Sequence, residues 1–466
     1  MIMIIFIVLI ITFVLGLCFN RNEYKHKEKG QSLHSPFGIQ HINFCGMQET
    51  SQSQCNPHQE PINFYGAQDE GQSINSSLGQ HSNLYSAQMK THSAYHNLAD
   101  RITFSNDEME KYTTIAENTV MELIAQMKKE LLRGDPEICS DFIRTGSSFE
   151  GLKVKPEVEF DFMITLLPPP TFNFYLVSVI NEIPKMFSKI GVSENGFKMM
   201  LLQSSKSVFQ KPMEFKEKFC KGDYFQSLAV NRWFQSLADR AIKTLPKISP
   251  DVRFSQQGPA RTMKIRKSGF PEISVDLVPA VYINGMYLVA KTYGGIMEEN
   301  YSLKDTLWRM SFSIQEKTFL EEISSSLPTN SCHQKTLQIL KYLKQSTPSL
   351  HWSAGLSSYH LKTVWLHMLQ NKSSYDWKYE KLDQRVLELI DNLLTNLGKR
   401  ALHYFFIGNP ELLCRDIDLP KDFLQYHIKC NLFNDINQTT IEQAYLQLVQ
   451  LKNQIDSTIE ELCATL

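Results

Sequence analysis

Three carboxylates stand inside two short apolar segments, where charged side chains are unusual. Glu159 and Asp161 lie within residues 158–166, and Asp276 lies within residues 273–278. Side chains alternate along a β-strand, so Glu159 and Asp161 are expected to project together from one face. Neighbouring carboxylates repel each other and raise each other's pKa. This pattern predicts a site for a hard divalent cation, Mg²⁺ or Mn²⁺, with Asp276 completing the oxygen ligands.

A glycine-containing turn precedes the first two carboxylates, with the sequence Thr145-Gly146-Ser147-Ser148. Glycine lets the backbone approach phosphate oxygens closely, and a hydroxyl with backbone N–H groups can hold them. Alone, Gly-Ser is usually an ordinary turn, and one Glu-x-Asp is usually an exposed strand edge. The turn, the acidic pair and the later aspartate in this order favour metal-assisted chemistry on a phosphate.

The elements that would position these residues are expected in the order of a long helix, a mixed α and β region, and a mostly helical region. Ser105 and Glu108 make a capping-box pair before an amphipathic pattern that predicts a long helix. Its apolar face comprises Met109, Tyr112, Ile115, Thr119, Leu123, Met127 and Leu131. Helical patterns dominate from about 305, including 382–397 and a last helix expected from a Thr439/Glu442 capping box to about Leu462. The fold class predicted is α+β with two lobes, a mixed α and β lobe and a C-terminal helical lobe.

The ordered motifs resemble those of a known family. Gly146-Ser147 with Glu159-Phe-Asp161 is similar to the signature of the nucleotidyltransferase superfamily. Residues 308–313 (WRMSFS) and 356–363 (LSSYHLKT) resemble motifs of the cyclic GMP-AMP synthase and Mab-twenty-one-like family. The resemblance extends over roughly 105–440. It implies a bilobal nucleotidyltransferase fold, a mixed sheet with a long spine helix, at 105–304, and a helical Mab-twenty-one-like lobe at 305–466.

The resemblance also implies roles for individual residues. Glu159, Asp161 and Asp276 would be the catalytic, metal-binding triad, and Thr145, Gly146 and Ser147 would contact nucleotide phosphate. Arg309 would bind the acceptor nucleotide, Lys341 and Ser358 the donor phosphates, and Tyr359 would stack on a base. Without the motifs, Tyr359 would be read as a core aromatic, and Arg309 and Lys341 as solvated or ion-paired helix residues.

The N-terminus has a different character. Residues 1–19 carry no charge, and as a helix they would span about 28 Å, close to the thickness of a bilayer core. Basic residues follow this segment and none precedes it, which favours a single-pass membrane anchor with the catalytic region in the cytosol. A cleaved signal peptide and a mis-assigned start codon are the alternatives. Residues 20–104 contain a repeat of period 20, as in His41–Gln48 and Pro61–Gln68, whose polar composition predicts a disordered linker rather than a solenoid.

Composition and cysteine spacing limit the partners. The net charge is −1, with 42% hydrophobic and 21% charged residues, which excludes a wholly disordered or polytopic membrane protein. Between Phe312 and Lys341 only Cys332 and His333 could bind zinc, so no zinc site is expected and DNA is a doubtful activator. Duplex RNA is the activator proposed instead. Basic residues that could contact it, or could simply form a solvated face, are Lys128, Lys129, Arg133, Lys206, Lys211, Lys216, Lys218 and Lys221.

Two functions of different classes remain open. The first is a ligand-activated innate-immune nucleotidyltransferase that uses ATP and GTP to make a cyclic dinucleotide, with linear products as a variant. The second is an inactive, membrane-anchored Mab-twenty-one-like scaffold, a class that includes proteins resembling the inositol-trisphosphate-receptor-interacting group. The anchor favours the scaffold, whereas the retained triad favours the enzyme.

Overall fold

The computed structural model describes residues 94–177, 186–194, 211–245, 251–255, 261–291, 304–347, 350–419 and 430–466. All of these residues belong to one compact unit, Ile74–Leu466. The anchor expected at 1–19 lies outside the described residues, as does the linker expected after it up to residue 93. Within the described ranges, no helix is both long enough and apolar enough to cross a membrane.

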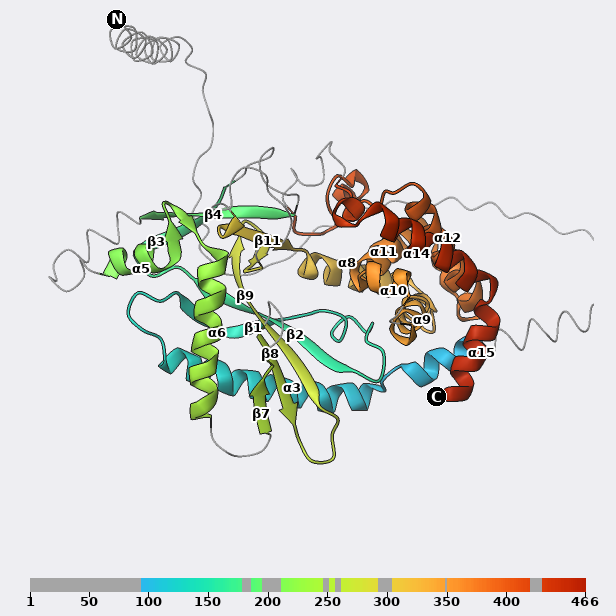
Figure 1. The fold of residues 1–466 in the computed structure, drawn as a ribbon, viewed down its shortest axis with the longest axis horizontal. Coiled ribbons are helices and arrows are strands. Elements are labelled where there is room, and N and C mark those ends of the chain that lie inside the picture. Colours follow the sequence, from blue (N-terminus) through green and yellow to red (C-terminus); the bar gives the residue numbers. More distant parts are fainter. Residues whose placement is uncertain are drawn as a thin grey trace, which may run out of the picture. The chain divides into compact units, whose positions relative to one another are not determined.

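The described part contains one mixed β-sheet (Figure 1). The main path of the sheet runs β1 (Glu137–Thr145), β2 (Val158–Leu167), β9 (Ile273–Ile283), β10 (Met286–Val289), β11 (Leu307–Ser311), β4 (Phe187–Glu194), β6 (Tyr224–Phe225) and β5 (Cys220–Lys221). Off this path, β3 (Phe172–Val177) pairs with β4, and β7 (Asp251–Phe254) pairs with β8 (Arg261–Arg266), which pairs with β9. The pairing of β2 with β9 is parallel, and the other described pairs are antiparallel.

Helices complete the first hydrophobic core with the sheet. α3 (Asn106–Lys129) and α6 (Ser227–Thr244) pack on each other and against β9, and α5 (Lys211–Phe219) packs on α6. The Ser105–Glu108 capping box begins α3 as expected. Buried residues of α3, such as Val120 and Leu123, meet sheet residues in this core. The expected spine helix and the two acidic strands are therefore confirmed.

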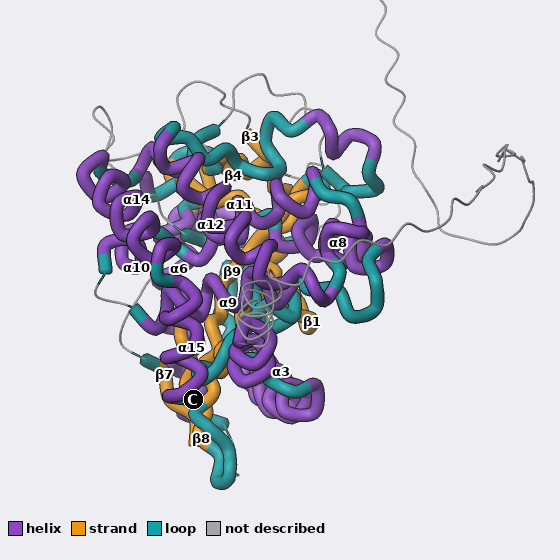
Figure 2. Tube along the Cα trace, turned by 90° about the vertical axis from the view of Figure 1, so that its right-hand side faces the viewer, coloured by secondary structure: helices purple, strands orange, loops and turns teal. Residues whose placement is uncertain are grey.

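The C-terminal part is helical and has a second core (Figure 2). Its elements are α8 (Ser313–Ser326), α9 (His333–Ser346), α10 (His351–Gly355), α11 (Ser358–Asn371), η1 (Ser374–Trp377), η2 (Tyr379–Lys381), α12 (Leu382–Gly398), η3 (Pro410–Cys414), η4 (Leu432–Asp435), α14 (Gln438–Asn453) and α15 (Ile455–Thr465). Trp352, Trp365 and Trp377 are fully buried in this core. The predicted α+β class, with a sheet followed by a helical region, is confirmed.

Residues before the domain boundary expected at 105 already belong to the folded unit. Residues 94–102 form a helix, whose side chains Tyr95, Leu98 and Ile102 are at most 1% exposed in the core of the helical part. The Tyr95 hydroxyl donates to Asp456 Oδ1 at 2.8 Å. This short helix follows a long polar stretch, and its partners, among them Asp456 of α15, Tyr379 and Lys335, are far away in the sequence.

The last helix also differs from its prediction. Asn437, rather than Thr439, caps α14, because its side chain accepts from the Thr439 N–H at 2.9 Å. The Glu442 carboxylate instead accepts from Arg400 at 2.8 Å. The helix ends at Asn453 and a separate α15 begins at Ile455, so the single helix predicted to about Leu462 is wrong.

Candidate active site

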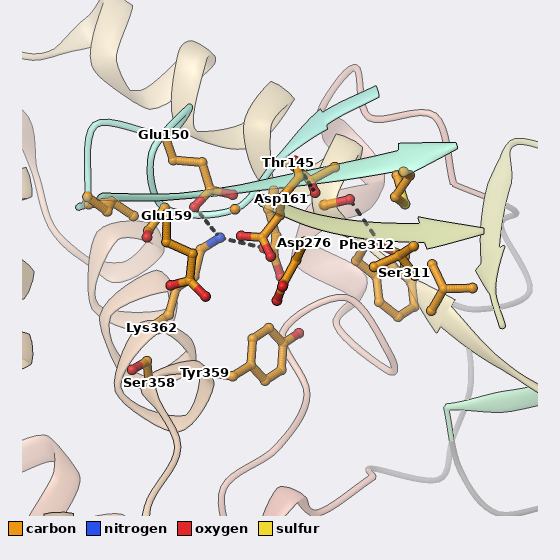
Figure 3. Close-up of a pocket in the computed structure, with 18 of the residues that line it drawn as sticks. Thr145, Glu150, Glu159, Asp161, Asp276, Ser311, Phe312, Ser358, Tyr359 and Lys362 are labelled. Carbon is orange, nitrogen blue, oxygen red and sulfur yellow. Dashed lines mark hydrogen bonds and ion pairs between the residues drawn. The ribbon is translucent and has the colours of Figure 1, made fainter. Parts of the chain in front are cut away.

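Parallel pairing of β2 with β9 places the acidic residues side by side. Asp161 lies directly opposite Asp276 in the register, and Glu159 lies opposite Ser274. The carboxylates of all three acidic residues point into the same region in Figure 3. The flanking side chains Phe160 and Leu277 are buried, as alternation along a strand requires. The sequence pattern predicted the shared face correctly, but the exact register depends on pairing across more than a hundred residues.

Hydrogen bonds join the end of β1 and the turn after it to β2, the strand that carries Glu159 and Asp161. Thr145 lies opposite Asp161 in the β1–β2 register, and its hydroxyl donates to the Asp161 carbonyl at 3.2 Å. The Ser148 hydroxyl donates to the Glu159 carbonyl. Gly146 has φ +81°, and a Cβ there would overlap the Asp161 carboxylate. Glycine is thus required both by the backbone conformation and by the close approach of the carboxylate.

The two facing aspartates are electrostatically strained. Burial, followed by repulsion from Glu159 and Asp276, raises the pKa of Asp161 to about 7. Burial also raises the pKa of Asp276, although the Thr262 hydroxyl, which donates to its Oδ1, lowers it. A hard cation between the carboxylates would relieve this repulsion. The donor set of Asp161 and Asp276 therefore fits Mg²⁺ or Mn²⁺.

Glu159 is held differently. Lys153 Nζ lies 2.9 Å from Glu159 Oε2, and the Lys153 side chain is only 11% exposed. Among the described residues, no three His, Cys, Asp or Glu side chains are grouped closely enough to hold a metal ion. The Lys153 ammonium thus engages one oxygen of the Glu159 carboxylate. The predicted ligation of a metal by Glu159, Asp161 and Asp276 stays a prediction.

All of the predicted site residues line one cavity of about 720 Å³. These are Thr145, Gly146, Ser147, Glu159, Asp161, Asp276, Arg309, Lys341, Ser358 and Tyr359. They come from β1 and the turn after it, and from β2, β9, β11, α9 and α11, so both the sheet part and the helical part contribute to its walls. Figure 3 shows Ser358 and Tyr359 across the cavity from Asp276.

Basic side chains line the same cavity. They are Lys153, Lys291, Arg309, Lys341, Lys344 and Lys362. Lys153 and Lys362 pair with carboxylates, whereas no ion pair is found within the described ranges for the other four. Burial lowers the pKa of Lys291 and Lys344, and burial together with Lys153 lowers the pKa of Lys341 to about 8. Basic side chains without an ion-pair partner among the described residues therefore lie in the same cavity as Asp161 and Asp276. This arrangement suits a polyphosphate whose oxygens bind the basic side chains and a cation held by the aspartates.

Two of the predicted phosphate ligands have distinct settings. Lys341 Nζ donates to the Leu152 carbonyl at 2.6 Å, so one of its three donors is already used by the protein. Ser358 is exposed and is the first residue of α11, which Ser357 caps through the His360 N–H. An anion at this point would meet the N-terminus of a helix of 14 residues.

Sequence reasoning missed a buried cluster behind Tyr359. Lys362 Nζ lies 2.6 Å from Glu150 Oε2 and 2.5 Å from Glu316 Oε2. Burial alone would lower the pKa of Lys362, but Glu316 and Glu150 outweigh it and raise that pKa. Burial, followed by the negative charge of Glu316, raises the pKa of the Tyr359 hydroxyl well above the usual value. Lys362 belongs to the 356–363 motif and Glu316 follows the 308–313 motif. These two motifs could therefore have identified both residues as candidate site residues.

The residues considered for zinc and RNA have local partners. His333 contacts Ser331 Oγ through Nδ1 at 2.7 Å and Ser324 Oγ through Nε2 at 3.3 Å. Lys216 pairs with Glu194 and Asp223, and Lys218 pairs with Asp135, so this basic stretch is partly neutralised. Lys206 lies outside the described residues.

Comparison with protein families gives two matches. Residues 148–322 match the Mab-21 protein nucleotidyltransferase domain, and residues 332–450 match the Mab-21 protein HhH/H2TH-like domain. Together these ranges include more than half of the chain. The boundary between them falls between α8 and α9, where the chain has already entered the helical part.

Similar curated proteins fall into two groups. The inositol 1,4,5-trisphosphate receptor-interacting protein of Takifugu rubripes is 26% identical over 343 residues, which is 68% of this chain and 64% of that protein. The human protein of the same name is 27% identical over 318 residues, 63% of this chain and 58% of that protein. The chain thus spans less than two thirds of their lengths. Cyclic GMP-AMP synthase-like receptor 3 of Stylophora pistillata is 28% identical over 279 residues, 58% of this chain and 74% of that protein.

Proposed function

Because the chain belongs to the Mab-21 nucleotidyltransferase family, we propose that it is a metal-dependent nucleotidyltransferase that joins ATP and GTP into a cyclic dinucleotide. The observation that carries this proposal is the pairing of Asp161 with Asp276 across β2 and β9, in a cavity whose Lys291, Lys341 and Lys344 have no ion-pair partner among the described residues. Nucleotidyl transfer needs carboxylates for a cation and cations for phosphates. A cavity of about 720 Å³ offers room for such substrates.

The residues of the cavity would divide the work. The Ser147 hydroxyl and the backbone N–H groups of the turn after β1 would bind a phosphate, while Gly146 leaves room for the Asp161 carboxylate beside it. Lys341 and the N-terminus of α11 at Ser358 would hold donor phosphates, and Arg309 would orient the acceptor. The face of Tyr359 would support a base. Mg²⁺ or Mn²⁺ at the carboxylates would supply Lewis-acid activation of the reacting phosphate.

A product analysis tests this function. The chain is incubated with all four nucleoside triphosphates, Mg²⁺ or Mn²⁺, and duplex RNA or DNA, and the products are identified by mass spectrometry. We expect a cyclic dinucleotide from the wild type and none from Asp161→Asn, which keeps the shape of the side chain but removes a charge. Turnover by Asp161→Asn at the wild-type rate would contradict the assignment.

We make two further proposals, one about the activator and one about the cellular location. We propose duplex RNA as the activator, bound through Lys128, Lys129 and Arg133 around the end of α3. Phosphate contacts release counterions, so RNA binding should weaken steeply as salt rises. Titration with duplex RNA at several salt concentrations tests this, and the absence of salt-dependent binding would contradict it. The cytosolic orientation behind an anchor at 1–19 is likewise proposed.

An inactive scaffold is the second candidate function. It is favoured by the Lys153–Glu159 ion pair, by the lack of a three-ligand group among the described residues, and by the similarity to receptor-interacting proteins. A scaffold predicts that triphosphates bind without turnover under every activating condition. The product analysis above therefore discriminates between the two functions.

A further inference from the structure

The ion pair between Lys153 and Glu159 occupies a place where the proposed reaction needs a free carboxylate. Lys153 Nζ lies 2.9 Å from Glu159 Oε2, and its side chain is 11% exposed while that of Glu159 is 42% exposed. Lys153 also lines the cavity with Asp161 and Asp276. A single ammonium therefore provides the positive charge nearest to one of the three acidic side chains.

Helix α9 fixes the backbone that carries Lys153. Three successive carbonyls, those of Glu150, Gly151 and Leu152, accept from Gln334, Gln338 and Lys341 at 3.3, 3.0 and 2.6 Å. These donors follow the spacing i, i+4, i+7 and so lie on one face of α9. Lys153 is the next residue along the chain. The helical part thus helps to set its position, in addition to the Ser148 hydroxyl that ties the same loop to the strand of Glu159.

Resting on the proposed function, we propose that Lys153 is a positioning residue that holds Glu159 as its counter-ion while no divalent cation is bound. A cation can then be ligated by Glu159 together with Asp161 and Asp276 only by displacing the Lys153 ammonium. Two positive charges cannot share the same carboxylate without repulsion, so Lys153 and the metal compete. Metal affinity is consequently tied to the contacts between α9 and residues 150–152.

Manganese binding without nucleotide tests this competition. Free and bound Mn²⁺ are measured by electron paramagnetic resonance during titration of the 466-residue chain, wild type and Lys153→Met. We expect the Kd for Mn²⁺ to fall about two- to fivefold in Lys153→Met, the range that partly exposed ion pairs support. Lys153→Arg retains the charge and should restore the wild-type affinity. Gln338→Ala should act in the same direction as Lys153→Met, but less strongly.

Lys155→Met is the matched control. Lys155 is on the same segment, and its removal changes the net charge equally, but its Nζ faces Glu108 at 3.5 Å and not the cavity. It should leave the Kd unchanged. If Lys153→Met does not fold, as judged by circular dichroism, Lys153→Gln takes its place. If the Kd for Mn²⁺ is unchanged or higher in the folded Lys153 variant, the competition between Lys153 and the metal is overturned, but the proposed metal site is not. If the wild type does not bind Mn²⁺, or if Asp161→Asn does not weaken binding, the proposed metal site is overturned as well.

Discussion

At the residue scale, Lys341 offers a pH-dependent test of phosphate binding. Burial and neighbouring Lys153 lower its pKa to about 8, so its charge is lost as the pH rises through about 8. One donor holds the Leu152 carbonyl, which leaves two for a phosphate while the amine is charged. We expect the apparent KM for ATP to rise between pH 7 and pH 9.5.

Substitution isolates this effect. Lys341→Met should raise the KM at pH 7 by about tenfold, the value of a charge-assisted hydrogen bond, and should flatten the alkaline rise. Because the folded pKa lies below the unfolded value of about 10.5, this group adds stability as the pH rises from about 8 to 10.5. Unfolding caused by this group cannot therefore mimic the loss of binding. If the KM for ATP changes with pH in the same way in the wild type and in Lys341→Met, Lys341 does not bind phosphate.

The residues that sequence could predict are those with a local pattern. The alternation around Glu159 and Asp161 indicates a shared face, and the following apolar positions indicate burial. Lys153 and Lys362 were missed because their partners come from other elements: Lys153 meets Glu159 across a loop, and Lys362 meets Glu150 from a helix more than two hundred residues away. Nothing in the sequence around Lys153 marks it as buried and paired, whereas Lys362 stands in the 356–363 motif and could have been found from it.

At the scale of elements, Gly146 allows the turn after β1 to lie directly against the Asp161 carboxylate of β2. Gly146 and Gly269 have nearly equal φ values, +81° and +79°, but a Cβ on Gly269 would meet nothing within 4 Å. Gly269→Ala should therefore cost only the backbone strain, about 1–2 kcal/mol. Gly146→Ala should cost more and should also abolish turnover, because its Cβ overlaps the Asp161 carboxylate. Urea denaturation measures both costs, and equal values would argue against the close approach.

The N-terminal helix at 94–102 predicts where a stable fragment must begin. A fragment of residues 105–466 lacks Tyr95, Leu98 and Ile102, which are buried in the helical core. Their loss should destabilise it relative to 94–466 by on the order of 5 kcal/mol. Thermal unfolding of the two fragments measures the difference. Equal melting temperatures would mean that this helix does not stabilise the fold.

Element boundaries were predictable where capping residues mark them, and not elsewhere. Ser105 and Glu108 indicate the beginning of α3 correctly. The helix at 94–102 falls in the predicted linker because a polar, repetitive stretch precedes it, and its apolar residues are buried only through elements distant in the sequence, such as α15. Likewise, the Thr439/Glu442 pattern predicted the wrong cap for α14, because Asn437, two residues earlier, is also a good capping residue.

At the scale of the whole described unit, the two hydrophobic cores define the site. The sheet core supplies the carboxylates, and the helical core supplies Lys341, Lys344, Ser358 and Tyr359. Contacts such as Lys362 with Glu150 join the two sides. Sequence indicated the two parts in the right order, but the cavity between their side chains depends on packing that no local pattern specifies.

Pyrophosphate release measures nucleotidyl transfer directly, whatever bases or linkages the product contains. The wild-type chain, supplied with ATP and GTP, Mg²⁺ or Mn²⁺, and candidate activators, should release pyrophosphate in a metal-dependent reaction. Asp161→Asn and Asp276→Asn should each lower this rate at least about a hundredfold while melting no lower than the wild type, because each relieves repulsion between the facing carboxylates. Equal rates in the wild type and both variants, or no release by the wild type under any of these conditions, would contradict a nucleotidyl-transfer centre at Asp161 and Asp276.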